Sequence, residues 1–153
     1  MNGIKLKLLL VFSIIVTFIS VAISGYFYKQ AGFREAQIKK QIDINFLNKL
    51  GMAQSSFGVD FLKQKNPTES NYFFYKCMSD VASAAASSAL SSYEEHNDLL
   101  GTSLSELNKA MQNSPEKVKN SQQVIYDMLT KIMLNPNNTE ATKKLHDYVG
   151  TLY

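Results

Sequence analysis

The amino-terminal part of the chain contains a continuous apolar run, in which polar positions do not recur with the spacing of a helix or a strand. From Leu8 to Ile23 the sequence reads LLLVFSIIVTFISVAI, with no charged residue and with hydroxyl groups as its only polar side chains. The 23 residues from Leu6 to Tyr28 are enough, at about 1.5 Å per residue, to cross a hydrocarbon core of about 30 Å. The pattern therefore predicts one membrane-spanning helix in residues 1–28.

Both ends of this run carry residues that are typical of a membrane interface. Lysines precede it, and aromatic residues followed by a lysine close it. The predicted membrane-interface residues are Lys5, Lys7, Tyr26, Phe27, Tyr28 and Lys29. A cleaved signal peptide is the alternative, because Ser20, Ala22 and Ser24 offer small residues at a suitable spacing. We expect the short tail to stay inside and the following domain to lie on the extracytoplasmic side.

Beyond Lys29 the apolar positions recur with the period of a helix, and no stretch alternates with a period of two. We therefore expect residues 29–153 to form one helical domain. The first apolar stripe runs from about residue 30 to 65 with spacings of four and three. Its members are Ile38, Ile42, Phe46, Leu50, Ala53, Phe57 and Phe61. This helix is expected to continue directly from the membrane span and to end at Asn66-Pro67.

A second stripe begins near Ser70 and continues to Met111, and it crosses a segment of small residues that reads ASAAASSALSS. Alanine is the best helix former, and the small residues keep the phase of the stripe, so this segment is not typical of a flexible tether. We predict that another helix packs closely against it. The predicted close-packing residues are Ala82, Ala85, Ala86 and Ala89. Gly101 leaves open whether the helix breaks near residue 100.

Two further helices are predicted near the carboxyl end. Ser114-Pro115-Glu116 provides an N-cap hydroxyl, a proline at the first helical position and an acid in the first turn. That helix is expected to stop at Asn135-Pro136, and Asn137 or Thr139 is expected to cap the last one.

Charge favours antiparallel pairing of the first two helices. Residues 29–65 carry seven bases and three acids, a net +4, whereas residues 69–98 carry one base and five acids, a net −4. The predicted fold is thus all-α. One amino-terminal transmembrane helix continues into an elongated antiparallel bundle of three to four helices with coiled-coil-like packing.

Several kinds of chemistry are not supported by the sequence. A net charge of +3 is too small to indicate a nucleic-acid-binding surface. Cys77 is the only cysteine, so no intrachain disulfide can form. The residues Glu94, Glu95, His96 and Asp98 are read as solvated helix surface rather than a metal site, because they fan around different faces. His146 has no second histidine nearby. We therefore predict no catalytic residue, no metal and no cofactor.

Four consecutive aromatic residues are the strongest candidate for a binding surface. Tyr72, Phe73, Phe74 and Tyr75 would cover every side of a helix, and a bundle interior can bury only about half of them. We predict that the others bind a protein partner, because exposed aromatic residues favour such contacts. The alternative is that a loop or the final helix folds over them as an end cap.

The plan of one amino-terminal span followed by helical residues 30–153 resembles the front end of a chemoreceptor, and we expect no complete receptor, because no second span follows. We hypothesise a single-pass membrane-anchored helical interaction or accessory protein of an envelope complex, without catalysis. Its expected partners are membrane lipid and either another protein or a second copy of the chain. The alternatives are a small-molecule-binding, sensor-like helical bundle and a secreted helical protein released by signal-peptide cleavage.

Overall fold

The computed structural model describes the backbone of residues 3–153 and the side chains of residues 9–153. The side chains of Lys5 and Lys7, two of the predicted interface residues, therefore lie outside the described part. The chain divides into two compact units, Met1–Ile38 and Lys39–Tyr153. The compact domain thus begins later than the predicted boundary at residue 29.

The first unit contains the amino-terminal part of helix α1, which runs from Gly3 to Phe57. The large apolar side chains from Leu9 to Phe33 are between 44% and 86% exposed. From Leu9 onward α1 is long and apolar enough to cross a membrane. Because apolar residues occur on every side of this part of the helix, water is an unfavourable surrounding for all of its faces.

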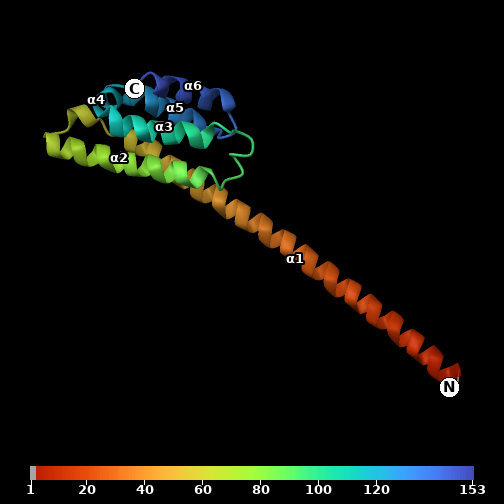
Figure 1. Cartoon of the computed structure of the whole chain (residues 1–153). Helices are drawn as coiled ribbons and strands as arrows, with labels where there is room; N and C mark the ends of the chain where they lie inside the picture. Colours follow the sequence, from red (N-terminus) through yellow and green to blue (C-terminus); the bar gives the residue numbers. More distant parts are fainter. Residues whose placement is uncertain (1–2) are drawn as a thin grey trace. The chain divides into compact units, whose positions relative to one another are not determined.

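The second unit confirms the all-α prediction, since every regular element within residues 39–153 is helical (Figure 1). The elements that follow α1 are the 3₁₀ helix η1 (Phe61–Lys63), α2 (Pro67–Ser88), α3 (Leu100–Asn113), α4 (Pro115–Asn120), α5 (Gln122–Leu134) and α6 (Thr139–Gly150). Six α-helices are therefore described where three to four bundle helices and a span were expected. The additional breaks lie at residues 89–99 and at Ser121.

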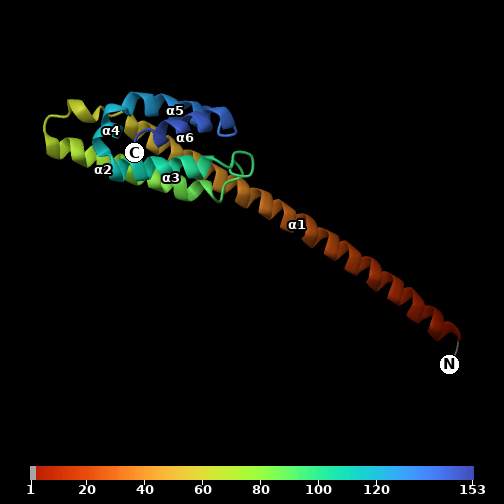
Figure 2. The same cartoon turned by 45° about the horizontal axis from the view of Figure 1, so that its top comes forward.

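Helices α1, α2, α3, α6 and α5 form a closed ring around the core. Helix α2 packs against α3, α3 against α6 and α6 against α5. Side-chain hydrogen bonds connect α1 to its two neighbours in the ring, from Ser56 to Asp80 of α2 and from Gln54 to Thr130 of α5. Figures 1 and 2 show the course of these helices in the second unit. The short helix α4 and η1 lie against each other at one end of this ring.

The interior of the ring is built from one apolar face of each helix. Its largest fully buried side chains are Phe46, Phe57, Phe61, Leu50, Leu100, Leu104, Leu107, Met111, Ile125, Leu129, Ile132 and Leu145. Burying each such side chain contributes about 1.5–3 kcal/mol relative to leaving it in water. The free thiol of Cys77 is buried in the same core. This core, and not any covalent link, holds the second unit together.

Helix α1 ends at Phe57, earlier than the predicted end near residue 65. The amide of Gly58 bonds to the carbonyl of Ser55, which closes a tighter turn. The carboxylate of Asp60 then accepts hydrogen bonds from the amides of Leu62 and Lys63 and caps η1. Asn66, which was expected to end the first helix, instead caps α2 by accepting from the amide of Glu69. The hydrogen bonds of this turn end the helix at Phe57, although the helical spacing of apolar residues continues to Phe61.

Turns at residues 89–99 separate α2 from α3, so the helix breaks just before Gly101, which was one of the two alternatives left open. The carboxylate of Asp43 holds this segment to α1, because it accepts hydrogen bonds from both the amide and the hydroxyl of Ser92, at 2.8 and 2.7 Å. Glu94 accepts from the amide of Gly101 at the start of α3. A Cβ on Gly101 would lie 2.6 Å from the Ser88 hydroxyl, so any larger residue here would force the Ser88 side chain to shift.

The structure places the predicted close-packing residues of the small-residue segment in different surroundings. Ala84 and Ser88 are fully buried, whereas Ala82 and Ala85 are half-buried and Ala86 and Ala89 are exposed. The buried face of α2 begins with large side chains and continues with small ones at the same helical spacing. Its members are Phe74, Cys77, Val81, Ala84 and Ser88. Ala89 also lies beyond the end of α2, so it cannot extend this face.

Candidate interaction groove

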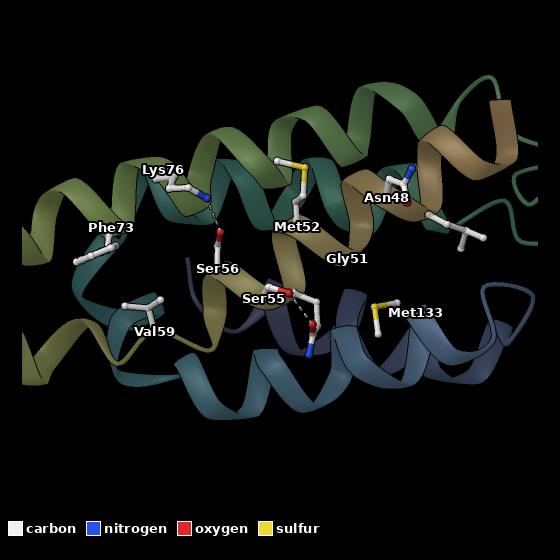
Figure 3. Close-up of a pocket in the computed structure, with 11 residues that line it drawn as sticks. Asn48, Gly51, Met52, Ser55, Ser56, Val59, Phe73, Lys76 and Met133 are labelled. Carbon is white, nitrogen blue, oxygen red and sulfur yellow. Dashed lines mark hydrogen bonds between the residues drawn. The ribbon is translucent and has the colours of Figure 1, made fainter. Parts of the chain in front are cut away.

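A groove lies over the carboxyl-terminal part of α1 in the second unit. Residues between Leu47 and Val59, in α1 and just after its end, contribute its floor. Phe73 and Lys76 of α2 form one wall, and Met133 of α5 contributes to the other. Figure 3 shows α1 running between α2 and α5, with Gly51 and Ser55 between the two walls. The volume of this α1 groove is about 640 Å³.

The floor of the α1 groove is open because its central residues are small. A Cβ on Gly51 would meet the sulfur of Met133 at 3.7 Å, which is an ordinary contact. Met52 is 46% exposed, and Leu47, Phe73 and Met133 are half-buried while they pack on the core. The groove therefore presents apolar side chains to the surroundings around a floor without bulky groups.

One charged cluster lies at the end of the α1 groove near Val59. The ammonium group of Lys76 donates to the carboxylate of Asp80 at 2.8 Å and to the hydroxyl of Ser56 at 3.2 Å. The Lys76 side chain is 50% exposed, whereas Asp80 is only 12% exposed. The hydrogen bond to Asp80 raises the pKa of Lys76 above its ordinary value, so Lys76 is charged at neutral pH. The groove thus carries an accessible positive charge at one end.

The four predicted partner-binding aromatic residues point to different surroundings. Phe74 is buried at 2% exposure, and Phe73 packs on the core while it lines the α1 groove. Tyr72 and Tyr75 are 65% and 61% exposed. Tyr72 contacts Phe73 edge to face, with ring centroids 5.4 Å apart. The structure therefore brings Tyr72 and Phe73 next to the α1 groove, while Tyr75 borders a separate hollow on α2.

Lys119 occupies the end of the bundle where α4 meets α2. Its side chain is only 9% exposed, and its ammonium group donates to Glu116 at 3.0 Å and to Asn71 at 3.3 Å. The same ammonium group lies 5.2 Å from the centroid of the Phe74 ring. Two hollows of about 290 and 490 Å³ meet at these residues. The Glu116 carboxylate, the Asn71 amide oxygen and the face of the Phe74 ring all interact favourably with the Lys119 charge. Lys119 therefore covers Phe74 as part of the folded bundle.

The acidic segment and the histidines are used in local contacts. Glu95 pairs with Lys39 at 3.6 Å, and the His96 ring nitrogen Nδ1 lies 2.9 Å from the carbonyl of Ser92. His146 Nδ1 lies 2.9 Å from Glu106. Within the described residues, no group of three or more His, Cys, Asp or Glu side chains is arranged to hold a metal ion. Burial raises the pKa of the Cys77 thiol far above its ordinary value, so this thiol is a poor nucleophile.

The predicted interface aromatics of the first unit are all exposed. Tyr26, Phe27 and Tyr28 are 65%, 62% and 86% exposed, and the rings of Tyr26 and Phe27 meet edge to face at 6.0 Å. Lys29 directly follows them and is also exposed. Their placement at a lipid interface stays a prediction.

The α1 groove itself was not anticipated from the sequence. A signal in the sequence is Gly51, whose missing side chain opens the floor of the groove. Met133 is distant in the sequence from the α1 residues of the groove, and it reaches them only because α5 packs beside α1 in the ring. Comparison of the chain with protein-family models, with curated proteins and with solved structures found no match.

Proposed function

We propose that this protein is a single-pass membrane-anchored interaction protein, in which the amino-terminal part of α1 spans the membrane and the bundle binds a protein partner. The observation that carries the proposal is the combination of two features in one chain. A helix from Leu9 onward exposes apolar residues on every side, and a folded bundle presents an apolar groove. Such a helix is stable in hydrocarbon, and such a groove fits a binding role rather than catalysis.

The extracytoplasmic side and membership of an envelope complex belong to the same proposal. A short tail before the span normally stays inside, and a long folded domain is translocated largely regardless of its charge. On this basis we place the bundle outside the cytoplasm, as an accessory subunit. A secreted form would arise only if the segment near Ala22 or Ser24 were cleaved.

The partner surface is proposed to combine the α1 groove with the adjoining aromatic residues. Tyr72 is exposed next to Phe73, and the two rings extend one wall of the groove. Aromatic side chains at the edge of an apolar groove are typical contributors to binding energy in protein interfaces. Lys76 adds a charge that can select among partners.

Photo-crosslinking in native membranes tests this proposal. A photoreactive amino acid is placed at Tyr72 or at Met52, both of which are well exposed, and at Lys143 of α6 as an exposed control. We expect a protein adduct from the first two positions and none from Lys143. Adducts with lipid alone, or equal adducts from all three positions, would contradict a docking role for this face.

A small-molecule-binding bundle is the second candidate, because about 640 Å³ lies within the range of ligand pockets. Native mass spectrometry of the purified protein separates the two functions. A bound small molecule of constant mass, lost in a variant with a filled groove, would favour the sensor-like interpretation. The intact mass also reports whether the amino-terminal segment is retained.

A further inference from the structure

The shape of the α1 groove restricts what can occupy it. Its floor extends from Leu47 in α1 to Val59 just beyond the end of that helix, which is about 18 Å, or slightly more than three helical turns. Two helices, α2 and α5, flank that floor, and Gly51 and Ser55 place no bulky side chain at its centre (Figure 3). A helix packs on another helix at an interaxial distance of about 8–10 Å, depending on the side chains at the contact. The groove is therefore suited to one additional helix.

The lining of the groove indicates which face such a helix would present. Leu47, Met52, Phe73 and Met133 provide apolar contacts on both sides of the floor. Methionine side chains are flexible and polarizable, so they adapt to different apolar partners. An amphipathic helix binds such a groove through apolar residues at positions i, i+3 or i+4, and i+7. A fully polar segment would leave these side chains in contact with water.

Charge indicates what the partner carries near one end. Lys76 is the only ionised side chain among the residues that line the α1 groove. An ammonium group has three N–H donors, of which Asp80 and Ser56 accept two. Half of the Lys76 side chain is exposed, whereas the Asp80 carboxylate is almost covered. The third N–H group of Lys76 is therefore available to a carboxylate of a partner, which would share the ammonium group with Asp80.

A second copy of this chain does not satisfy the same geometry through this face. A two-fold symmetric contact brings one patch against its own copy, so the patch has to be complementary to itself. Two concave grooves placed face to face meet at their walls and leave both floors empty. A convex helix from another protein fills the floor.

We propose that the α1 groove binds an amphipathic helix of a partner protein. This inference rests on the proposed function and adds the kind of partner, which the proposed function leaves open. This helix is about three turns long and carries an acidic residue at the end that lies against Lys76. The apolar face of the helix rests on Gly51 and Ser55 between α2 and α5. The acidic residue sets the register of the helix in the groove.

The test uses the full chain in detergent micelles and fluorescently labelled synthetic helical peptides. One peptide carries leucines at i, i+3, i+4 and i+7 and a glutamate near one end, and its companion carries the glutamate near the other end. Matched peptides replace the glutamate with lysine, and one further peptide scrambles the leucine positions. Binding is measured by fluorescence anisotropy.

Two variants and two matched controls sharpen the measurement. Ser55→Trp fills the floor of the groove, and Ser105→Trp places the same side chain on exposed α3 surface. Lys76→Glu reverses the charge in the groove, and Lys143→Glu reverses an exposed charge on α6. Circular dichroism confirms that each variant keeps its helical content, so a loss of binding is not a loss of folding.

We expect saturable binding of a glutamate peptide to the unmodified chain, with a preference of about 3- to 10-fold over its lysine counterpart, as for a partly exposed charge pair. Lys76→Glu should reverse this preference, and Ser55→Trp should weaken binding at least about tenfold because the bulky ring occupies the floor. The scrambled peptide should not bind, and both control variants should behave like the unmodified chain.

Other outcomes overturn the inference. Equal binding of glutamate and lysine peptides, or binding that Ser55→Trp leaves unchanged, would show that the helix does not lie in the groove. Detergent or fatty acid retained only by the open groove in native mass spectra would identify a lipid as the occupant. Self-association that Ser55→Trp abolishes, seen by sedimentation, would identify a second copy.

The two proposals fail in different ways. If the chain is extracted from membranes by alkaline carbonate but the peptide ranking holds, membrane anchoring is wrong and the groove inference stands. If the chain stays in the membrane and crosslinks a protein from Tyr72 while no glutamate peptide binds, the interaction function stands and the helical, acidic partner is wrong.

Discussion

The proposed membrane span, residues 9–28, and the bundle, residues 39–153, place the same apolar residue types in opposite surroundings. Phe18 in the span is 73% exposed, whereas Phe46 and Phe57 in the bundle are 0% and 1% exposed. In the bundle each helix has one apolar face and the other helices cover it. In the span apolar residues occupy all faces, so no single neighbouring helix could cover them. The arrangement of apolar residues around the helix, more than their number, separates a membrane segment from a core helix.

The largest expected effect comes from placing charge in the span. Val16→Arg combined with Ile19→Arg should disfavour membrane insertion by about 5–7 kcal/mol, since each charge near the centre costs about 2.5–3.5 kcal/mol. The measurement is the fraction of the chain that alkaline carbonate releases from membranes. The matched double variant Leu90→Arg with Val124→Arg changes exposed apolar residues of the bundle and should leave that fraction unchanged. Equal release from both variants would show that the span is not embedded in lipid.

The next effect concerns the loss of a phenyl ring in each region. Phe57→Ala should lower the free energy of unfolding of the bundle by about 3–5 kcal/mol, because it leaves a cavity in the core. The ring lost is 1% exposed and lies 6.1 Å from the ring of Phe61. Phe18→Ala, made in the span, should change that free energy by less than about 0.5 kcal/mol. Urea unfolding followed by circular dichroism in micelles compares the two variants.

A smaller effect tests the buried face of α2. Ala84→Leu should destabilise the bundle by about 1–3 kcal/mol, because Ala84 is fully buried and the added atoms have no space. Ala86→Leu, two residues away on the exposed side, should change stability by less than about 0.5 kcal/mol. Thermal unfolding of both variants is the measurement. A larger loss for Ala86→Leu would restore the phase predicted from the sequence and imply a neighbour outside the chain.

The smallest effect is a pH dependence at the turn segment. Burial raises the pKa of Glu94, while the hydrogen bond from the Gly101 amide lowers it and the charge of Asp98 raises it. Because the net shift is upward, the folded chain binds the Glu94 proton more tightly than the unfolded chain. Ionised Glu94 therefore opposes folding at neutral pH, and this opposition disappears as the pH falls through the raised pKa.

Glu94→Gln keeps an acceptor for the Gly101 amide and removes the charge. The variant should melt about 1 °C above the unmodified chain at pH 7 and together with it at pH 4. Glu95→Gln, at an exposed neighbour, is the matched control for removing one charge. A variant that is less stable than the unmodified chain at pH 7 would mean that the charged hydrogen bond outweighs the effect of burial.

The sequence predicted α1 better than α2, and the reason lies in residue size. Of the predicted stripe, Phe46, Leu50, Ala53, Phe57 and Phe61 are buried, whereas Ile42 is half-buried and Ile38, in the first unit, is exposed. Large apolar residues at spacings of three and four permit only one inward face. Their phase is therefore readable without a structure.

In α2 the same rule selected a face other than the buried one, because alanine and serine occupy every position from Ala82 to Ser88. With several alanines on adjacent faces, the pattern does not select one of them. The buried side chains of Cys77 and Val81 place the inward face of α2 one residue away from the face predicted through Ala82, Ala85 and Ala89. The sequence contained that signal, but the small residues obscured it.

The turns at residues 89–99 and the α1 groove depend on contacts that no local pattern contains. Asn97 donates to the carbonyl of Pro136 and to the hydroxyl of Thr142, and Asp43 holds Ser92. These partners lie 39 to 49 residues from the turns. A groove is the space left between helices, so its presence follows from how the ring closes and not from any one segment.

The closed ring also imposes an order in time on the newly made chain. Ribosomes deliver the floor of the groove long before its second wall, since Gln54 of α1 donates to Thr130 of α5, which follows 76 residues later. At about 5–20 residues per second, that interval is about 4–15 seconds. During this interval, only the helices synthesised before α5 can pack against the inner side of α1. The groove is therefore complete only after α5 has been synthesised and has packed beside α1.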